Sequence, residues 1–571
     1  MRHKKQKPGS GLRSMRGAFM LLAILALASA GLAQRRTDTT PIRPQIPKAD
    51  RHAPNRIFLE RADELRKERY DSFQIVVGDV MFRQGDMFMY CDSAHFYEDP
   101  GAVRAFGNVR MEQGDTLFVF ADRLDYSDTT ELAILFADPG NKVRLINKDV
   151  TLTTDIFNYD LAIELGFYEV GGTLTDKNNR LTSWYGEYSP STKDALFKDQ
   201  VALHSLREKD TLDIYTEEML YNTATRVAIL DTISTIVSAD GTIHTSNGAY
   251  NSDTQKADLF DRSLVVASNG NTLTGDTLYY DQLTGFGEAF GNIELTDTAN
   301  KVVLTGDYGL YFEANDSARV TGRALAREYS QKDTLYLHAD TIRAFKKITP
   351  EHFVDDTVRV EADTTHYLIA EPCVRFYRVD LQGICDSLTA VGRDSMLWMH
   401  NHPVVWNGER QIFGNVIQVH FKDSVAEWAK LPEFGFMAEW IDEGFYNQLT
   451  GKEMTAFFED RDLRHLDVSG NVQAIMLPME NDSTYNKIAN IESSFLAADF
   501  RDRTVERMKL WPETSGTMTP LYLAKKSLFY LPAFRWFEPL RPTSPEDVFN
   551  RPPEMLELFK EPPFGGRAAS D

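Results

Sequence analysis

The chain has 571 residues, enough for about three or four domains at roughly 150 residues each, although repeat proteins break that rule. Its composition is 42% hydrophobic and 11% aromatic, which excludes wholesale disorder and an integral helical membrane protein. The formal charge is −22, and the first 33 residues carry six basic and no acidic residues, so the remainder stands at −28. Nucleic acid is therefore not an expected partner.

The N-terminus has the layout of a secretory signal peptide. An eleven-residue apolar run, Ala18 to Ala28, follows the basic stretch and is itself followed by small residues. This run is shorter than the roughly 20 residues that a membrane span needs. We expect residues 1–33 to be removed by cleavage after Ala33 or Ala30. Residues 34–56 are polar, contain four prolines and are expected to form a linker.

An internal repeat begins near Ile57. Eight stretches of eight residues each end in an aromatic residue: Phe96, Tyr126, Tyr159, Tyr188, Tyr221, Tyr250, Tyr280 and Tyr311. The fourth residue of each stretch recurs about every 30 positions: Asp92, Asp122, Asp155, Trp184, Glu217, Ser246, Asp276 and Asp307. A small residue precedes it, and an apolar residue lies two positions earlier: Met89, Val119, Leu152, Leu181, Ile214, Ile243, Leu273 and Leu304. A fixed period of this length is typical of stacked repeat units.

A second column has the same period but is out of phase with the first. It consists of Phe106, Phe136, Phe167, Phe197, Leu230, Phe260 and Phe290. Core packing is the ordinary explanation of such an aromatic column, and contact with a ligand is the alternative.

The spacing within a unit predicts strands. The apolar residue and the small residue lie two positions apart, so they share one face of an extended chain. The units are rich in Thr, Val, Leu, Ile and Tyr and are separated by turn signals, so we expect a nearly all-β chain whose units stack around a shared core. One short helix is expected at Leu59 to Tyr70. The small residues either keep an apolar groove open or mark sharp corners between sheets, and the sequence leaves both interpretations open.

The repeat spacing divides the chain. Regular units cover residues 57–345, and a second, less regular segment covers residues 346–475. Residues 476–571 form a C-terminal segment, in which ten of the 23 prolines lie from Trp511 onward. We expect that proline-rich tail to be extended or irregular rather than a packed domain.

Signatures of catalysis are absent from the sequence, since it has no phosphate-binding glycine loop, CxxC pair, HExxH motif or nucleophile elbow. His400 and His402 would share one face of a strand, but spacing fixes no third ligand, so surface histidines are the favoured interpretation. The recurrent Asp is expected to cap turns, because a catalytic pair is needed only once. We therefore predict no catalytic residue, no metal site and no cofactor.

The cysteines allow two interpretations. Cys373 and Cys385 would pair in an oxidising compartment and leave Cys91 free. Alternatively, Cys385 repeats the role of Cys91, which is one small residue in the column of small residues.

The stretch from Ala105 to Arg123 resembles the recurring signature of the OstA family, the lipopolysaccharide transport proteins of the LptA type. Degenerate copies begin at Gly78, Gly291 and Gly470. The similarity covers roughly residues 57 to 475. This chain is far longer than LptA proteins and is most similar to the long OstA-like proteins of Bacteroidetes-type bacteria.

The resemblance implies an elongated β-jellyroll in which two antiparallel sheets form a V. Its apolar interior would carry the acyl chains of lipopolysaccharide across the periplasm toward the outer membrane, without enzymatic activity. Partners would be lipopolysaccharide, LptC- and LptD-like proteins, or further copies of the chain added end to end through strand edges.

The residues expected to face lipid come from the two columns. The first choice is Leu152, Leu181, Ile214, Ile243, Leu273 and Leu304, and the second choice is Phe106, Phe136, Phe167, Phe197, Phe260 and Phe290. Two alternative functions remain, a structural or adhesive solenoid with a filled core and a solenoid enzyme that acts on carbohydrate.

Overall fold

The computed structural model describes residues 56–67, 71–99, 101–207, 210–239, 241–268, 270–299, 301–312, 317–349, 352–354, 358–360, 363–392, 394–422, 425–459, 462–480, 484–501 and 504–565. The predicted signal peptide, its cleavage sites and all of the predicted linker except Arg56 lie outside these residues. None of the helices in the described ranges has both the length and the apolar character that crossing a membrane requires.

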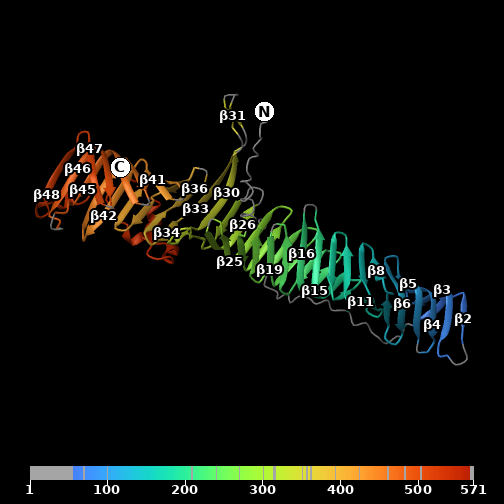
Figure 1. The fold of residues 1–571 in the computed structure, drawn as a ribbon. Coiled ribbons are helices and arrows are strands. Elements are labelled where there is room, and N and C mark those ends of the chain that lie inside the picture. The colour runs from blue at the N-terminus through green and yellow to red at the C-terminus, as the bar shows by residue number, and fades with distance from the viewer. Residues whose placement is uncertain are drawn as a thin grey trace. The chain divides into compact units, whose positions relative to one another are not determined.

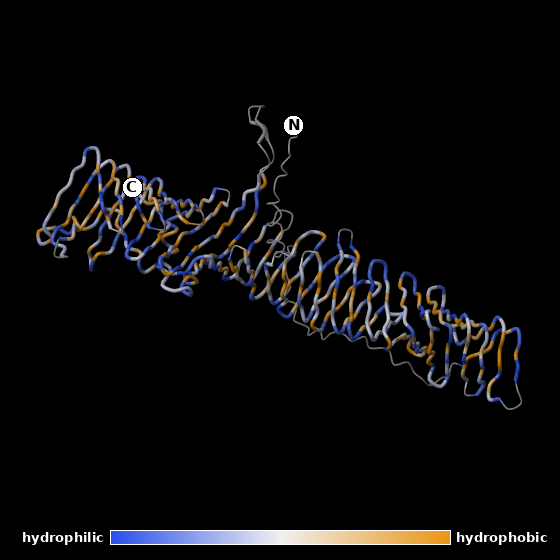
Figure 2. Tube along the Cα trace, viewed as in Figure 1, coloured by the Kyte–Doolittle hydropathy of each residue, from blue (hydrophilic) through white to orange (hydrophobic). Residues whose placement is uncertain are grey.

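The regular secondary structure of the described residues is almost entirely antiparallel strands (Figure 1), and these residues fall into two compact units. We call residues 56–269 with 274–287 the N-terminal unit, and residues 270–273 with 288–565 the C-terminal unit. Hydrophobic stretches lie within the strands and polar stretches at many of the turns (Figure 2).

The strands of the N-terminal unit are β1 (Phe58–Arg61), β2 (Glu64–Arg66), β3 (Gln74–Gln84), β4 (Met87–Tyr97), β5 (Ala102–Gln113), β6 (Leu117–Ser127), β7 (Leu132–Phe136), β8 (Val143–Asn147), β9 (Val150–Thr154), β10 (Ile156–Asp160), β11 (Leu165–Tyr168), β12 (Gly172–Asp176), β13 (Asn179–Ser183), β14 (Tyr185–Tyr188), β15 (Asp194–Leu206), β16 (Thr211–Asn222), β17 (Val227–Leu230), β18 (Ser234–Ser238), β19 (Gly241–Thr245), β20 (Asn247–Asn251), β21 (Lys256–Phe260), β22 (Ser263–Ala267) and β24 (Thr277–Asp281). Two strands lie across the division of the chain, β23 (Thr272–Gly275) and β25 (Phe286–Asp297).

The elements of the C-terminal unit are β26 (Val302–Phe312), β27 (Ser317–Thr321), β28 (Leu325–Glu328), β29 (Leu335–His338), β30 (Thr341–Thr349), β31 (His352–Val354), β32 (Val358–Val360), β33 (Asp363–Glu371), β34 (Val374–Arg378), β35 (Leu381–Cys385), β36 (Ser387–Val391), β37 (Met396–His400), β38 (Val404–Asn407), β39 (Arg410–Gly414), β40 (Val416–Lys422), β41 (Val425–Leu431), β42 (Gly435–Asp442), β43 (Phe445–Gly451), β44 (Glu453–Glu459), β45 (Asp462–Met476), β46 (Lys487–Arg501), β47 (Thr504–Trp511), β48 (Ser515–Pro520), the 3-10 helices η2 (Leu521–Leu523), η3 (Lys526–Leu528), η4 (Glu538–Leu540) and η5 (Asp547–Phe549), and α1 (Pro553–Leu558).

In the N-terminal unit the chain passes back and forth between two sheets. In the first, sheet I, β9 pairs with β8 and β12. The next strand, β10, pairs with β7 and β11 in the second, sheet II. Long strands such as β5 and β6 take part in both sheets, and their register breaks between Phe106 and Val109, where they cross. One repeat therefore adds two strands to each sheet.

The crossings are corners, and they explain the small residues and the recurrent Asp. Asp155 is the bend between β9 and β10, and Thr154 before it is buried. At a return corner, Gly107 and Asn108 both have left-handed backbone, with φ of +72° and +44°, which glycine adopts without steric cost. The Asn108 side-chain amide donates to the Asp92 carboxylate at 2.8 Å. The structure therefore supports the interpretation of the small residues as corner residues.

The predicted helix at Leu59 to Tyr70 is wrong within the described part of that stretch. Residues 58–61 and 64–66 form β1 and β2, which pair with β3, and Asp63 between them donates its N–H to the Gly78 carbonyl at 2.9 Å. Pairing with a strand edge outweighs the helical charge pattern, because a short helix gains little stability without tertiary packing. The stretch is instead a first, degenerate copy of the repeat.

The C-terminal unit has the same alternation between two sheets, which we call sheets III and IV. Sheet III contains β34, β35, β38, β39, β42 and β43, and sheet IV contains β33, β36, β37, β40, β41 and β44. The predicted change of regularity after Phe345 falls inside this unit, within β30. Strands β31 and β32 form a separate two-stranded hairpin.

The segment after β48 is irregular, as predicted, but it is packed, contrary to the second half of that prediction. We call residues 521–565 the strap, and Figure 1 shows it beside β34 and β42. Phe537, Leu540 and Met555 of the strap are buried against Trp406 and Phe413 of sheet III. The prolines prevent regular structure but not burial, because the aromatic and aliphatic side chains between them have an apolar sheet face to cover.

Glutamines hold the backbone of the strap. Gln411 donates to the Arg535 carbonyl at 2.9 Å and accepts from the Phe537 N–H at 2.7 Å. Gln448 holds the Phe529 carbonyl and the Leu531 N–H in the same way, at 2.7 and 2.9 Å. These side chains satisfy backbone groups that have no strand partner.

Replacing Gln411 by Ala is expected to loosen the strap. The change leaves two backbone groups of the strap without partners, at a cost of about 2 kcal/mol. Limited proteolysis should cut the strap faster in this variant than in the wild-type protein. Gln418→Ala, on the other sheet and remote from the strap, is the control, and equal cleavage of the two variants would contradict the assignment.

Replacing Gly166 by Ala is expected to destabilise the N-terminal unit by about 1–3 kcal/mol through overpacking. The added methyl group would collide with the ring of Phe157, which lies on the neighbouring strand of the same sheet. Gly516→Ala, where a methyl group meets only ordinary contacts, is the control. Urea unfolding midpoints that fall equally in both variants would show that general glycine effects dominate.

Candidate functional site

The interior of the N-terminal unit contains an apolar ladder. Its members lie directly opposite one another across successive strands of sheet I: Phe82, Met89, Met111, Val119, Leu145, Leu152, Leu174, Leu181, Leu203, Ile214, Ile236, Ile243 and Val265. All are buried except Ile243, which is partly exposed. The ladder is continuous because one repeat always contributes two strands to the sheet.

The ladder contains four of the six residues chosen first as lipid-facing: Leu152, Leu181, Ile214 and Ile243. Leu273 is also buried, and Leu304, on β26, is partly exposed. Leu181 and Ile214 are 0% exposed, so this interior is filled by its own side chains. Their contact with lipid stays a prediction, and it requires the two sheets to separate.

Sequence reasoning missed half of the ladder. The alignment of the eight-residue stretches found one strand of each repeat and not its hairpin partner. It therefore missed Leu145, Leu174 and Ile236. Each of these lies seven positions before a residue that was found, on the other side of a turn. A search for a second apolar residue at that offset would have identified them.

A tyrosine row lies on the inner face of sheet II. Tyrosines alternate with Ala or Gly across successive strands in direct register: Tyr126, Ala133, Tyr159, Gly166, Tyr188, Ala195, Tyr221, Ala228, Tyr250, Ala257 and Tyr280. The small residues leave room for the rings, and tyrosines from 126 to 250 are buried. Burial raises the pKa of Tyr188 and Tyr250 above the usual range. The tyrosines that end these eight-residue stretches therefore pack in the interior.

The second column of predicted residues does not form one inner row. Phe197 is fully buried, whereas Phe290 is exposed. The others, Phe106, Phe136, Phe167 and Phe260, are partly exposed, and each follows a buried residue in its strand, so each points to the outer face. The Arg123 guanidinium lies 4.4 Å from the ring centroid of Phe136, which is a polar surface environment. A lipid-facing role for this column stays a prediction. Four of its members point away from the interior.

Hydrogen bonds close the N-terminal unit along the side away from the corners. Tyr188 accepts from the Asn147 amide at 3.1 Å, and Tyr221 donates to Asp176 at 2.9 Å and accepts from Asn179 at 3.0 Å. In each case the tyrosine comes from sheet II and its partner from a hairpin of sheet I. We call this line of polar contacts the seam.

The C-terminal unit differs, because its inner faces are partly exposed to solvent. On sheet IV the partly exposed residues lie in direct register: Ala344, Leu368, Ala390, Leu397, Val419, Ala429 and Ala456. On sheet III, Val405, Ile412 and Met437 are likewise in register and partly exposed. The next row toward the corners, which includes Leu388 and Ile417, is buried.

The exposure follows from a change at one position of the repeat. The residue four positions after the corner is a buried Tyr in the N-terminal unit, as at Tyr159 after Asp155. In the C-terminal unit Tyr311 after Asp307 is still a buried Tyr, but the later corners have Ala390 after Asp386, Val419 after Asn415 and Ala456 after Lys452. These side chains are too short to reach the opposite sheet, so they leave an apolar inner surface uncovered.

The predicted shared face of His400 and His402 is wrong. Asn401 and His402 form a left-handed corner with φ of +59° and +58°, and His402 is buried beneath the strap, where its Nε2 lies 3.0 Å from the Pro562 carbonyl. His400, at the end of β37, has its pKa lowered by burial. No cluster of three or more metal-ligating side chains occurs among the described residues.

The three cysteines are free and buried. Burial raises the pKa of the Cys91 thiol to about 12, so this thiol is unreactive near neutral pH. Cys385 precedes the corner residue Asp386, as Cys91 precedes Asp92. The structure therefore supports a repeated structural role and not a Cys373–Cys385 disulfide.

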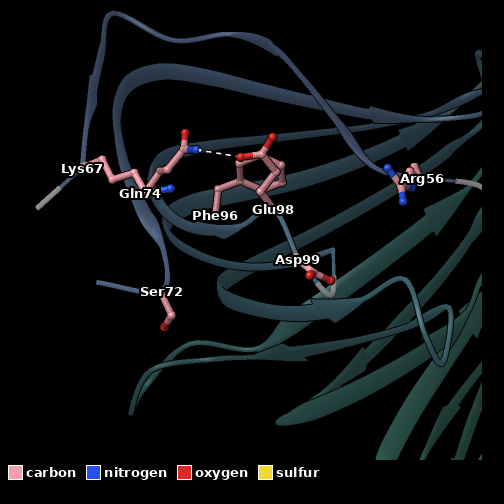
Figure 3. Close-up of a pocket in the computed structure, with 7 residues that line it drawn as sticks. All are labelled: Arg56, Lys67, Ser72, Gln74, Phe96, Glu98 and Asp99. Carbon is pink, nitrogen blue, oxygen red and sulfur yellow. Dashed lines mark hydrogen bonds between the residues drawn. The ribbon is translucent and has the colours of Figure 1, made fainter. Parts of the chain in front are cut away.

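A hollow of about 460 Å³ lies near the first strands (Figure 3). Arg56, Lys67, Glu98 and Asp99 are among its lining residues, and Gln74 donates to the Glu98 carboxylate at 3.2 Å. Phe96 is the one apolar side chain of this lining. The charged lining of this hollow does not suit an alkyl chain.

One family model matches the first repeats of the chain. The model of a family described as "OstA-like protein" matches residues 54–209. None of the curated proteins is significantly similar to the chain. One similar solved structure is LptH, the LptA homologous periplasmic component of the conserved lipopolysaccharide transport device from Pseudomonas aeruginosa; it is 20% identical, with a TM-score of 0.17, over 20% of this chain and 79% of LptH. The family match covers the first repeats, with their corners and the start of the ladder, so these residues are similar to an OstA-like protein.

Proposed function

We propose that this protein is a periplasmic, non-enzymatic carrier of lipopolysaccharide, whose acyl chains bind between the sheets. The observation that carries the proposal is the partly exposed apolar inner surface of the C-terminal unit, around Val419 on sheet IV and Ile412 on sheet III. Apolar side chains on an inner face that remain in contact with solvent are unusual for a filled core. The OstA-like match over residues 54–209 supports the same function.

The energetics favour a carrier of this kind. An acyl chain of about 14 carbons has a transfer free energy from water of roughly 11 kcal/mol, at about 0.8 kcal/mol per methylene group. A row of Ala, Leu and Val side chains shields such a chain from water without specific polar contacts. Passage along the row therefore avoids the cost of exposing the chain at each step.

A structural solenoid with a filled core is the second candidate. The packed interior of the N-terminal unit, where Leu181 and Ile214 are fully buried, favours it for that part of the chain. The two functions differ at the C-terminal unit, since a scaffold has no need of an uncovered apolar inner surface.

Strand edges at both ends of the described chain support the proposed partners. β1 and β2 pair only with β3, and β47 and β48 pair only with β46, among the described residues. Unpaired edges are sites for strand addition. We infer that LptC- and LptD-like proteins, or further copies of this chain, add at these edges, and that the N-terminal signal directs the protein to the periplasm.

Replacing Val419 by Glu is expected to lower binding of radiolabelled lipopolysaccharide by about tenfold, because the carboxylate must lose its hydration when an acyl chain covers it. Val419 is partly exposed, so the fold should tolerate the change. Gln418→Glu adds the same charge to the opposite face of the same strand and should leave binding unchanged. Equal binding by both variants, with unchanged unfolding temperatures, would contradict the proposed site.

A further inference from the structure

The seam contains a buried ion-pair cluster at its centre. The Arg226 guanidinium contacts Asp176 through Nε at 3.1 Å and through Nη2 at 3.3 Å, and it contacts Asp253 through Nη1 at 2.7 Å. Asp176 lies at the end of β12 in sheet I, while Arg226 precedes β17 in sheet II. Both are buried, and Tyr221 also donates to Asp176. The cluster therefore ties the two sheets together where they would separate.

Neighbouring contacts extend this connection. The Asn179 amide donates to Tyr221 at 3.0 Å and to the Ser252 hydroxyl at 2.9 Å, which joins a sheet I hairpin to a sheet II hairpin a second time. The Asn147 amide donates to Tyr188 and to the Pro190 carbonyl at 3.3 Å. The contacts thus repeat at intervals along the interior.

The chemistry of the seam differs from that of a permanent core. Apolar residues of similar volume are often as stable as a buried ion pair or more so, so stability alone does not explain Arg226 and Asp176. The amide oxygens of Asn147 and Asn179 are buried without a hydrogen-bond partner among the described residues. Such groups are costly when buried and regain hydrogen bonds when water reaches them. The closed seam is therefore held by contacts that water can replace.

We propose that the seam is a lateral gate: the interior behind it, lined by the apolar ladder, is a second acyl-chain site that opens when Arg226 and Asp176 separate. This inference rests on the proposed function. It adds the N-terminal unit to the part of the chain that binds acyl chains. After Tyr311 the described part of the C-terminal unit has Ala or Val where the N-terminal unit has tyrosines, so it has no such row to close it. One chain would thus hold an exposed lipid surface and a closed one.

The gate can be tested by locking it. Asn179→Cys and Ser252→Cys, joined by a short reducible dithiol-reactive cross-linker, hold the two hairpins together. Cys91, Cys373 and Cys385 are replaced by Ala in the background chain, so only the introduced pair can react with the reagent. A photoreactive diazirine side chain at position 181 reports on the interior, one at position 182 reports on the outer face, and one at position 412 reports on the C-terminal unit. The probe is tritium-labelled lipopolysaccharide.

In the unlocked protein we expect labelling at position 181. This labelling should fall about tenfold when the pair is cross-linked and should return when the cross-linker is reduced. Labelling at position 412 should not change. If position 412 is labelled but position 181 is not, or if locking has no effect at position 181, the gate is excluded and the proposed function stands. If neither position is labelled, the proposed function fails together with the gate.

A second variant replaces the latch, the Arg226–Asp176 pair, by apolar side chains. Arg226→Met with Asp176→Leu should decrease labelling at position 181, because water cannot replace apolar contacts as it replaces the ion pair, and the seam then stays closed. The matched control is Arg104→Met with Asp125→Leu, an exposed pair 3.1 Å apart on the outer face of sheet II. Equal labelling in the two variants would overturn the assignment of Arg226 and Asp176 as the latch.

Discussion

The corner is the constraint on which both units depend. A chain that turns between two sheets every few residues must place a small side chain before each bend and left-handed residues at each return, as at Thr154 and at Gly107–Asn108. The N–H of Asp63 and the N–H of Asp307 each donate to the glycine carbonyl of a neighbouring return corner, at 2.9 and 2.8 Å. Because the corners fix where each strand begins, they also fix which residues face inward. The ladder and the tyrosine row follow from that register.

One position of the repeat then decides whether the interior is closed. A tyrosine four residues after the corner spans the space to the opposite hairpin, and an alanine or glycine beside it on the sheet accommodates its ring. When the tyrosine becomes Ala390, Val419 or Ala456, the same backbone leaves apolar surface uncovered. The two units thus share a scaffold and differ in access to the interior, and that difference is where the proposed function and the proposed gate arise.

Most of the fold could be predicted from the sequence, because the repeat is visible in several columns. Strand periodicity gave the all-β class, and the column through Leu152 and Ile214 marked the inner face correctly. Long-range partners were not predictable: the helix expected at Leu59 to Tyr70 is replaced by strand pairing, and the proline-rich segment packs through Phe537 and Met555 on a face that the sequence does not single out. The partly exposed inner surface of the C-terminal unit was not predicted, although the loss of the final aromatic residue after Tyr311 was already a signal for it.

The strap is held partly through its main chain. Gln411 and Gln448 bind carbonyl and amide groups that every residue other than proline offers, so these contacts do not depend on which side chains lie between the buried aromatic anchors. The intervening positions are therefore free to accumulate substitutions without detaching the segment. Related chains should accordingly retain the two glutamines and the anchors while their remaining C-terminal residues diverge beyond ready alignment.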